Sequence, residues 1–112
     1  MSDKRSNESP VPIFILQNSG PISCVLFSEF IKDILFASNR NGNLNVYDLN
    51  LRRSLFEANS NKESILSIAE LNENNIFTHS RNGVIQKWTR SQNVWNPLSK
   101  QNYLNFRFYF IL

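Results

Sequence analysis

A chain of 112 residues with 41% hydrophobic and 19% charged side chains has an ordinary globular composition and room for one small domain at most. Its net charge of +3 comes from basic residues scattered between Lys4 and Arg107, whereas nucleic-acid-binding proteins usually gather them on one face, so the charge does not favour a nucleic-acid partner. The single cysteine, Cys24, excludes an intrachain disulfide and is typical of a reducing compartment, cytoplasm or nucleus. The sequence has neither the apolar core of a secretion signal nor a run of the ~20 apolar residues that cross a bilayer, so we expect no membrane association.

The predicted elements are short and extended. Residues 1–12 consist mainly of Ser, Asn, Pro and charged side chains, and we expect them to form a disordered leader. Apolar runs rich in Ile, Val, Phe and Tyr follow, separated by turn-forming residues, and this pattern predicts antiparallel β structure. Residues 27–36 could instead form a helical turn and residues 62–73 an amphipathic helix, but the regularity of the neighbouring runs favours strands. The runs are IFIL (13–16), ISCVLF (22–27), ILFAS (34–38), LNVYDL (44–49), SLFEA (54–58), SILSIAEL (64–71), NIFTHS (75–80) and VIQKW (84–88).

The chain repeats itself after 41 residues. ILFASNRNGNLNVYD (34–48) aligns without a gap to NIFTHSRNGVIQKWT (75–89), so that the two Asn-Gly pairs coincide and Tyr47 coincides with Trp88. A repeat of about 40–45 residues that holds four short strands is the period of a β-propeller blade. The sequence therefore predicts an all-β fold of two antiparallel four-stranded blades, an incomplete β-propeller.

The repeat defines the expected organisation of the chain. A partial propeller covers 13–98, with blade one at about 18–58 and blade two at about 60–98, and an atypical apolar tail covers 99–112. Closed propellers hold 4–8 blades, so two blades form an incomplete unit. The tail sequence YLNFRFYFIL does not resemble the start of a third blade, which is consistent with a truncated product that has no independent function.

The segment FASNRNGNLNVYDL resembles a WD repeat, in which a strand ends in Ser, a tight turn follows, and the next strand ends in Trp-Asp or Tyr-Asp. FTHSRNGVIQKWTR follows the same pattern, with Thr89 in place of Asp and Lys87 in place of an apolar residue. Both repeats lack the Gly-His pair of the family before the first strand. The resemblance therefore implies blades in which the family's buried His–Ser–Asp–Trp hydrogen-bond network is incomplete.

Four segments are similar to the N-terminal blades of the ASTRA-associated protein 1 family, whose animal member is known as guanine nucleotide-binding protein β-subunit-like protein. They are PIFIL, YDLNLRRSLFE, SILSIAEL and IFTHSRNGVIQKW, and the similarity covers about residues 11–90. Ser80 and Asn82 depart from the family's Gly and Asp. The resemblance implies a non-catalytic, nuclear scaffold that binds protein partners in a multisubunit complex. It also implies a role in the maturation of phosphatidylinositol-kinase-like kinases and a link to chromatin assemblies.

The residues shared by the repeats have structural interpretations. In each Asn-Gly pair both residue types tolerate the positive φ that tight hairpins require. The aromatic rings at the ends of the third strands are expected to pack between neighbouring sheets. Asp48 is expected to accept hydrogen bonds from the turn of its own blade. The repeat signature comprises Asn41, Gly42, Tyr47, Asp48, Asn82, Gly83 and Trp88.

Four arginines are candidates for binding a protein partner. Arg40 and Arg81 occupy equivalent turns, and because equivalent loops of successive blades emerge on the same face, their guanidinium groups could bind an acidic segment. Arg52 and Arg53 lie on the link to the fourth strand and match the paired arginines of the family, so partner contact is one interpretation of them as well. The alternative for all four is that they are solvated loop residues.

The sequence does not favour catalysis, a cofactor, a metal or a small-molecule substrate. Cys24 lies in an apolar run where a buried, inert thiol is expected, and His79 is expected to satisfy a hydrogen bond within its blade. One cysteine and one histidine cannot supply the three or four clustered ligands of a zinc site, and three glycines provide no phosphate-binding loop. One alternative function is that the basic and aromatic segment KQNYLNFRFYF stacks on single-stranded nucleic acid.

Overall fold

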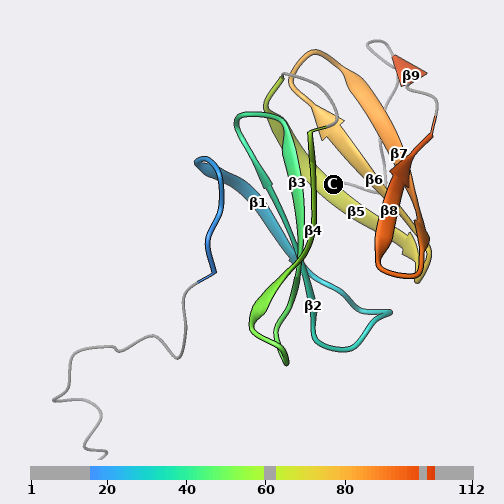
Figure 1. Ribbon diagram of the computed structural model, residues 1–112. Coiled ribbons are helices and arrows are strands. Elements are labelled where there is room, and N and C mark those ends of the chain that lie inside the picture. The colour runs from blue at the N-terminus through green and yellow to red at the C-terminus, as the bar shows by residue number, and fades with distance from the viewer. Residues whose placement is uncertain (1–15, 60–62, 99–100, 103–112) are drawn as a thin grey trace, which may run out of the picture.

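The computed structural model describes residues 16–59, 63–98 and 101–102 (Figure 1). The expected leader, residues 1–12, and all of the expected tail except residues 101–102 lie outside this part of the chain. The described residues form strands and turns and contain no helix. The all-β prediction is confirmed, and both helical alternatives are wrong: residues 27–36 join two strands of one hairpin, and most of residues 62–73 form one strand.

Two antiparallel sheets follow one another along the chain, and in each sheet the first four strands pair in chain order. The prediction of two four-stranded blades is therefore confirmed. The second sheet has an additional two-residue strand, which pairs with Val84 and Ile85 on the edge of β7 that β8 also uses. The first sheet consists of β1 (Ile22–Phe27), β2 (Ile34–Asn39), β3 (Asn43–Asp48) and β4 (Arg53–Asn59); the second of β5 (Ile65–Asn72), β6 (Asn75–Ser80), β7 (Val84–Ser91), β8 (Val94–Pro97) and β9 (Gln101–Asn102).

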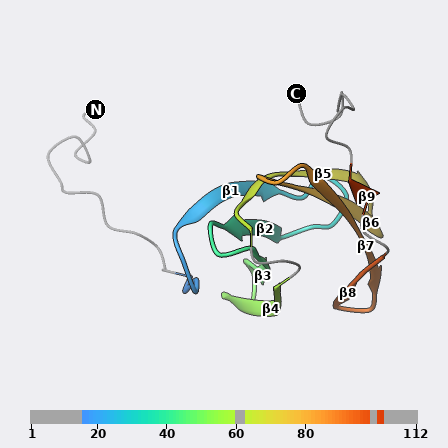
Figure 2. The same ribbon diagram turned by 90° about the horizontal axis from the view of Figure 1, so that it is seen from above.

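The core lies between the two sheets. Contacts between the sheets are concentrated at β1, β2 and β5, and they are sparse between β4 and β8, so the sheets diverge toward their fourth strands (Figure 2). Two edge-to-face aromatic pairs join the sheets, with ring centroids 5.4 Å apart for Phe36 and Trp95 and 6.4 Å apart for Phe56 and Trp88. The buried core residues are Ile34, Phe36, Leu44, Val46, Ile65, Ile68, Ile76, Trp88 and Trp95.

The two sheets stack front to back. The first sheet buries the face that carries Phe36 and Val46, whereas the second sheet buries the face that carries Ile76 and Trp88. By the 41-residue offset, Ile76 and Trp88 correspond to Leu35 and Tyr47, which pair across β2 and β3 on the opposite face of the first sheet. Each sheet therefore has one face suited to a preceding sheet and one suited to a following sheet.

The Asn-Gly pairs form the β2–β3 and β6–β7 turns, but only their glycines have positive φ: 88° at Gly42 and 83° at Gly83. The expectation that Asn41 and Asn82 would also use this region is not met. The backbone N–H of Gly42 donates to the carbonyl oxygen of Asn39 at 3.2 Å, and residues 40–42 separate β2 from β3. In a three-residue hairpin loop, a turn of ordinary φ is followed by one left-handed residue, which is the position of the glycine.

Candidate functional site

The hairpin connections lie at two opposite ends of the sheets (Figure 1). The β2–β3 turn with Arg40 and the β6–β7 turn with Arg81 lie at one end. Both arginines are exposed, and each backbone N–H donates to a carbonyl oxygen at 2.9 Å just before the first strand of its own sheet. Arg52 and Arg53 belong to the β3–β4 connection at the other end, so the four candidate arginines divide into two pairs.

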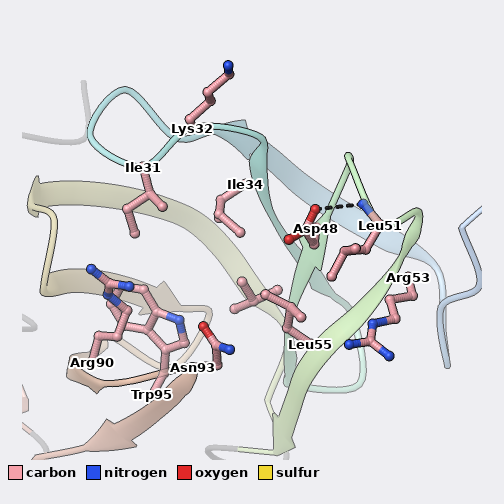
Figure 3. A pocket seen from close by; sticks show the side chains of 11 residues that line it. Ile31, Lys32, Ile34, Asp48, Leu51, Arg53, Leu55, Arg90, Asn93 and Trp95 are labelled. Atoms are coloured by element: carbon pink, nitrogen blue, oxygen red, sulfur yellow. Dashed lines mark hydrogen bonds between the residues drawn. The ribbon is translucent and has the colours of Figure 1, made fainter.

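A groove of about 200 Å³ opens between the sheets at the end that carries the β3–β4 connection. Apolar side chains of the first sheet line one wall, and Trp95 of β8 lies opposite them (Figure 3). Trp95 is only 2% exposed, and its packing against Phe36 gives this part of the wall a rigid support. The lining residues are Ile31, Lys32, Ile34, Val46, Asp48, Leu51, Arg53, Leu55, Arg90, Asn93 and Trp95.

Three basic side chains and one carboxylate surround this apolar floor. Arg90 is held in place, because its Nε donates to the carbonyl oxygen of Glu73 at 3.1 Å. Arg53 is exposed at the start of β4, and its side chain makes no hydrogen bond or ion pair with another described residue. Lys32 extends away from the other lining side chains in Figure 3. The lining therefore carries a net positive charge with one guanidinium anchored and one available.

Asp48, which supplies the carboxylate of the groove, stabilises the β3–β4 turn. Asp48 Oδ1 accepts a hydrogen bond from the backbone N–H of Leu51 at 2.8 Å, which closes the β3–β4 turn (Figure 3). Arg52 follows with a φ of 59°, in the left-handed region that non-glycine residues rarely adopt. This turn places Leu51, which is 51% exposed, beside the groove and aligns Arg53 with Asp48 across the two strands.

Of the lining residues, sequence reasoning singled out only Asp48 and Arg53, and it missed the charged side chains of Lys32 and Arg90 and the ring of Trp95. Arg90 lies 41 residues after Leu49, at the end of the third strand of the second repeat, where the chain enters the turn that lies at the same end as the β3–β4 turn. Extending the ungapped alignment of the two repeats beyond Thr89 would have indicated this position. Nothing in the repeat indicates Lys32, because the β1–β2 loop has no ungapped counterpart in the second repeat.

Cys24 and His79, the two residues that a Cys–His catalytic pair would need, lie on opposite sides of the second sheet. Cys24 packs against the core between the sheets. His79 alternates with Thr78 along β6 and therefore faces away from that core, on the far side of the second sheet. Its burial lowers the pKa of His79 below its usual value, so the imidazole is mostly neutral at pH 7. Within residues 16–59, 63–98 and 101–102 there is no group of three or more His, Cys, Asp or Glu side chains that could hold a metal ion.

The described residues include no helix that could span a membrane. No family model matches the sequence, and no curated protein matches it significantly. The chain resembles the β-propeller domain of Cps50 (Swd1) from Myceliophteria thermophila with a TM-score of 0.63 and 14% identity, over 76% of this chain and 30% of that one.

The two sheets are β-propeller blades. Their strand order is that of propeller blades, as the sequence predicts. The computationally designed propellers Ika8 and Ika4 each align with a TM-score of 0.62, at 17% and 14% identity. They are matched over 74% and 82% of this chain, which spans 24% of the Ika8 chain and 57% of the Ika4 chain. The described residues therefore form two blades, and the chain spans only part of each of these propeller chains.

Proposed function

We propose that this pair of blades is a protein-interaction scaffold, and that the groove between the blades binds an extended segment of a partner protein. The observation that carries the proposal is the combination of an apolar floor over Trp95 with the guanidinium groups of Arg53 and Arg90 around it. Such a surface suits a segment in which an acidic residue stands beside an apolar one.

The apolar contact supplies more of the binding energy than the charge. Full burial of a leucine-sized side chain contributes about 1.5–3 kcal/mol. An ion pair with an exposed arginine contributes about 0.2–1 kcal/mol, and salt screens it. Arg53 is exposed, so an ion pair with it falls in the lower of these two energy ranges. An apolar side chain that is buried against Leu55 and Trp95 falls in the higher range. The positive charge of the groove therefore favours those apolar segments that also carry acidic residues, while the apolar contact supplies most of the affinity.

The test uses fluorescence anisotropy of two short peptides, one alternating leucine with glutamate and one alternating leucine with lysine. We expect the full chain to bind the glutamate peptide and not the lysine peptide. Arg53→Glu should weaken binding at least several-fold. Arg40→Glu makes the same charge change at the opposite end of the sheets and should leave binding unchanged.

Equal binding of the two peptides, or equal loss in the two variants, would contradict the groove as the site. In the first case the positive lining does not select the partner. In the second case only the overall charge of the chain matters, because both substitutions alter it equally.

We further propose that the chain acts as the resemblance to the ASTRA-associated protein 1 family implies, as a nuclear adaptor for the maturation of phosphatidylinositol-kinase-like kinases and for chromatin-related assemblies. The support is the set of matching segments, above all YDLNLRRSLFE, which contains Arg52 and Arg53 beside the groove. Affinity purification of the tagged chain from nuclear extract, followed by immunoblotting for those kinases and their co-chaperones, tests it. The wild-type chain should retain them and Arg53→Glu should not; no retention by either contradicts the adaptor role.

A further inference from the structure

The loop between β1 and β2, residues 28–33, lies at the end of the sheets where the groove opens, and it extends toward the second sheet (Figure 1, Figure 2). The backbone N–H of Ser28 donates to the carbonyl oxygen of Ile34 at 2.9 Å, which closes the base of the loop. Ile31 and Lys32 of this loop line the groove. The position of the loop therefore determines the shape of one groove wall.

The Ser28 hydroxyl organises the interior of this loop. Its Oγ accepts a hydrogen bond from the backbone N–H of Ile31 at 2.9 Å and another from the backbone N–H of Phe30 at 3.2 Å. A serine hydroxyl has two acceptor lone pairs and one donor proton. Because the two backbone N–H groups use both lone pairs, the partner of the Ser28 proton has to be a group that only accepts.

Glu70, on β5 of the second blade, supplies this acceptor. Its Oε2 accepts the hydrogen bond from the Ser28 hydroxyl, and its Oε1 accepts the backbone N–H of Glu29 at 2.8 Å. Both oxygens of an ionised carboxylate accept hydrogen bonds, so a glutamate fits the two donors. A glutamine of the same shape would present N–H groups at one of the two places. The loop of the first blade is thus bound to a single side chain of the second.

Strand pairing explains why Glu70 points toward the first blade. Glu70 pairs with Ile76, which is fully buried in the core between the sheets, and cross-strand partners project from the same face. Phe27 holds the equivalent position in the first sheet, because it pairs with Leu35, which lies 41 residues before Ile76. A phenylalanine cannot accept these hydrogen bonds. The contact is therefore not a property of the repeat but of this pair of blades.

We infer that Glu70 is a positioning residue of the groove: it holds the β1–β2 loop against the second blade and so keeps Ile31 in the groove wall that a partner segment contacts. This inference rests on the proposed function of the groove. The Ile31 side chain points from the loop toward Arg90 and Trp95 on the opposite wall (Figure 3). When the loop is released, the groove loses this apolar contact, and the affinity for an apolar and acidic segment falls.

Amide hydrogen exchange of the full chain measures the positioning directly. Glu70→Gln keeps the shape of the side chain but replaces one acceptor oxygen with a donor. Exchange at the amides of residues 29–31 should therefore rise several-fold, while β6 keeps its protection. Glu57→Gln is the matched control, because Glu57 also accepts a serine hydroxyl, that of Ser19 at 2.8 Å, and does not line the groove. The control should leave exchange in the loop unchanged.

The affinity for the peptide that alternates leucine with glutamate measures what the positioned loop does. Glu70→Gln and Glu57→Gln each remove one negative charge, so charge alone predicts that neither substitution weakens binding of an acidic peptide. Loss of positioning predicts several-fold weaker binding for Glu70→Gln only. Ser28→Ala leaves the charge unchanged and should also weaken binding. The double variant should be no weaker than the more affected single variant, because both substitutions break the same contact.

Unchanged exchange in the loop of Glu70→Gln, with far-UV circular dichroism showing folded sheets, would overturn the inference. Faster exchange throughout both sheets would overturn it as well, because the effect would then be a general loss of stability. Equal loss of affinity in Glu57→Gln, or additive losses for Ser28→Ala and Glu70→Gln, would have the same consequence. If the wild-type chain binds neither peptide, the proposed function fails, whereas exchange in the loop decides the positioning by Glu70 without any peptide.

Discussion

Tyr47 and Trp88 hold the same position in two successive blades, 41 residues apart, yet their polar groups are satisfied by different parts of the chain. The Trp88 indole N–H donates to Thr78 Oγ1 at 3.0 Å on the neighbouring strand of its own blade. The Tyr47 hydroxyl donates to the carbonyl oxygen of Gln17 at 2.6 Å. Ala37 stands where the second blade has Thr78 and has no side-chain acceptor, so the first blade recruits residues 17–18 instead.

Thr78→Val should destabilise the chain by about 1–3 kcal/mol, because a buried indole N–H would lose its acceptor at unchanged side-chain volume. The midpoint of urea unfolding measures this. Thr89→Val is the matched control, since the Thr89 hydroxyl bonds Asn75 Oδ1 at 2.9 Å in a partly exposed place. The control should cost less than the Thr78 variant; the reverse order would show that the indole bond contributes little.

Tyr47→Phe should loosen the segment over the first blade. The variant loses the bond to Gln17 and the one from Asn18, each worth about 0.5–1.5 kcal/mol net. Hydrogen exchange should speed up at residues 17–20 more than at β6, which this cap does not touch. Uniform acceleration throughout both sheets would indicate a global loss of stability and contradict a local role.

The ionisation of Tyr47 gives a second test of the same environment. Burial, with a smaller contribution from Glu57, raises the pKa of Tyr47 above its usual 10.0, against the opposing hydrogen bond from Asn18. The unfolded chain therefore loses this proton first as pH rises, so the stabilising contribution is complete below pH 10 and declines above it. Thermal melts between pH 8.5 and 11 should show a steeper loss for wild type than for Tyr47→Phe; parallel curves would contradict the assignment.

His79 gives a pH dependence of the opposite sense. Burial lowers its pKa below the usual 6.5, so between the folded and unfolded pKa values the unfolded chain binds more protons. Stability should be complete above about pH 6.5 and fall as pH decreases below that value. Thermal melts from pH 7.5 to 5 should show that His79→Gln loses less stability over this interval than wild type does. An equal loss in both proteins would assign the acid sensitivity to other groups.

Gly42→Ala should cost about 1 kcal/mol, because a Cβ is disfavoured at a φ of 88°. Arg40→Ala in the same turn is the control, with ordinary φ and an exposed side chain, and it should stay within about 0.5 kcal/mol of wild type. Urea unfolding compares them. A Gly42→Ala variant as stable as wild type would contradict the need for glycine at this position.

Several features could be predicted from local pattern. The alternation of apolar and turn residues gave the strands, and the ungapped match around RNG gave two equivalent hairpins. The aromatic positions were expected between sheets, and this is correct for Trp88, whose partner Phe56 belongs to the other blade. Tyr47 instead lies under residues 17–18, because in the described structure no blade precedes the first one.

The groove could not be predicted in the same way. One wall comes from the β1–β2 loop and the β3–β4 turn of the first sheet and the other from the β7–β8 hairpin of the second, and only the stacking of the sheets brings the two walls together. The sequence identified Arg53 as a candidate for binding a partner, but it did not indicate that Arg53 and Arg90 line the same groove. Arg53 and Arg90 both line the groove, whereas Arg40 and Arg81 lie at the far end of the strands.

The sequence by itself determined the strands, the turns and the blade repeat, because hydrogen-bonded hairpins depend on neighbouring residues and on a period of two along each strand. Only the tertiary structure decided which face of each sheet is buried and where the groove opens. Those outcomes depend on how one sheet packs against another, and identical repeats leave that undetermined, since equivalent side chains face opposite surroundings in successive blades.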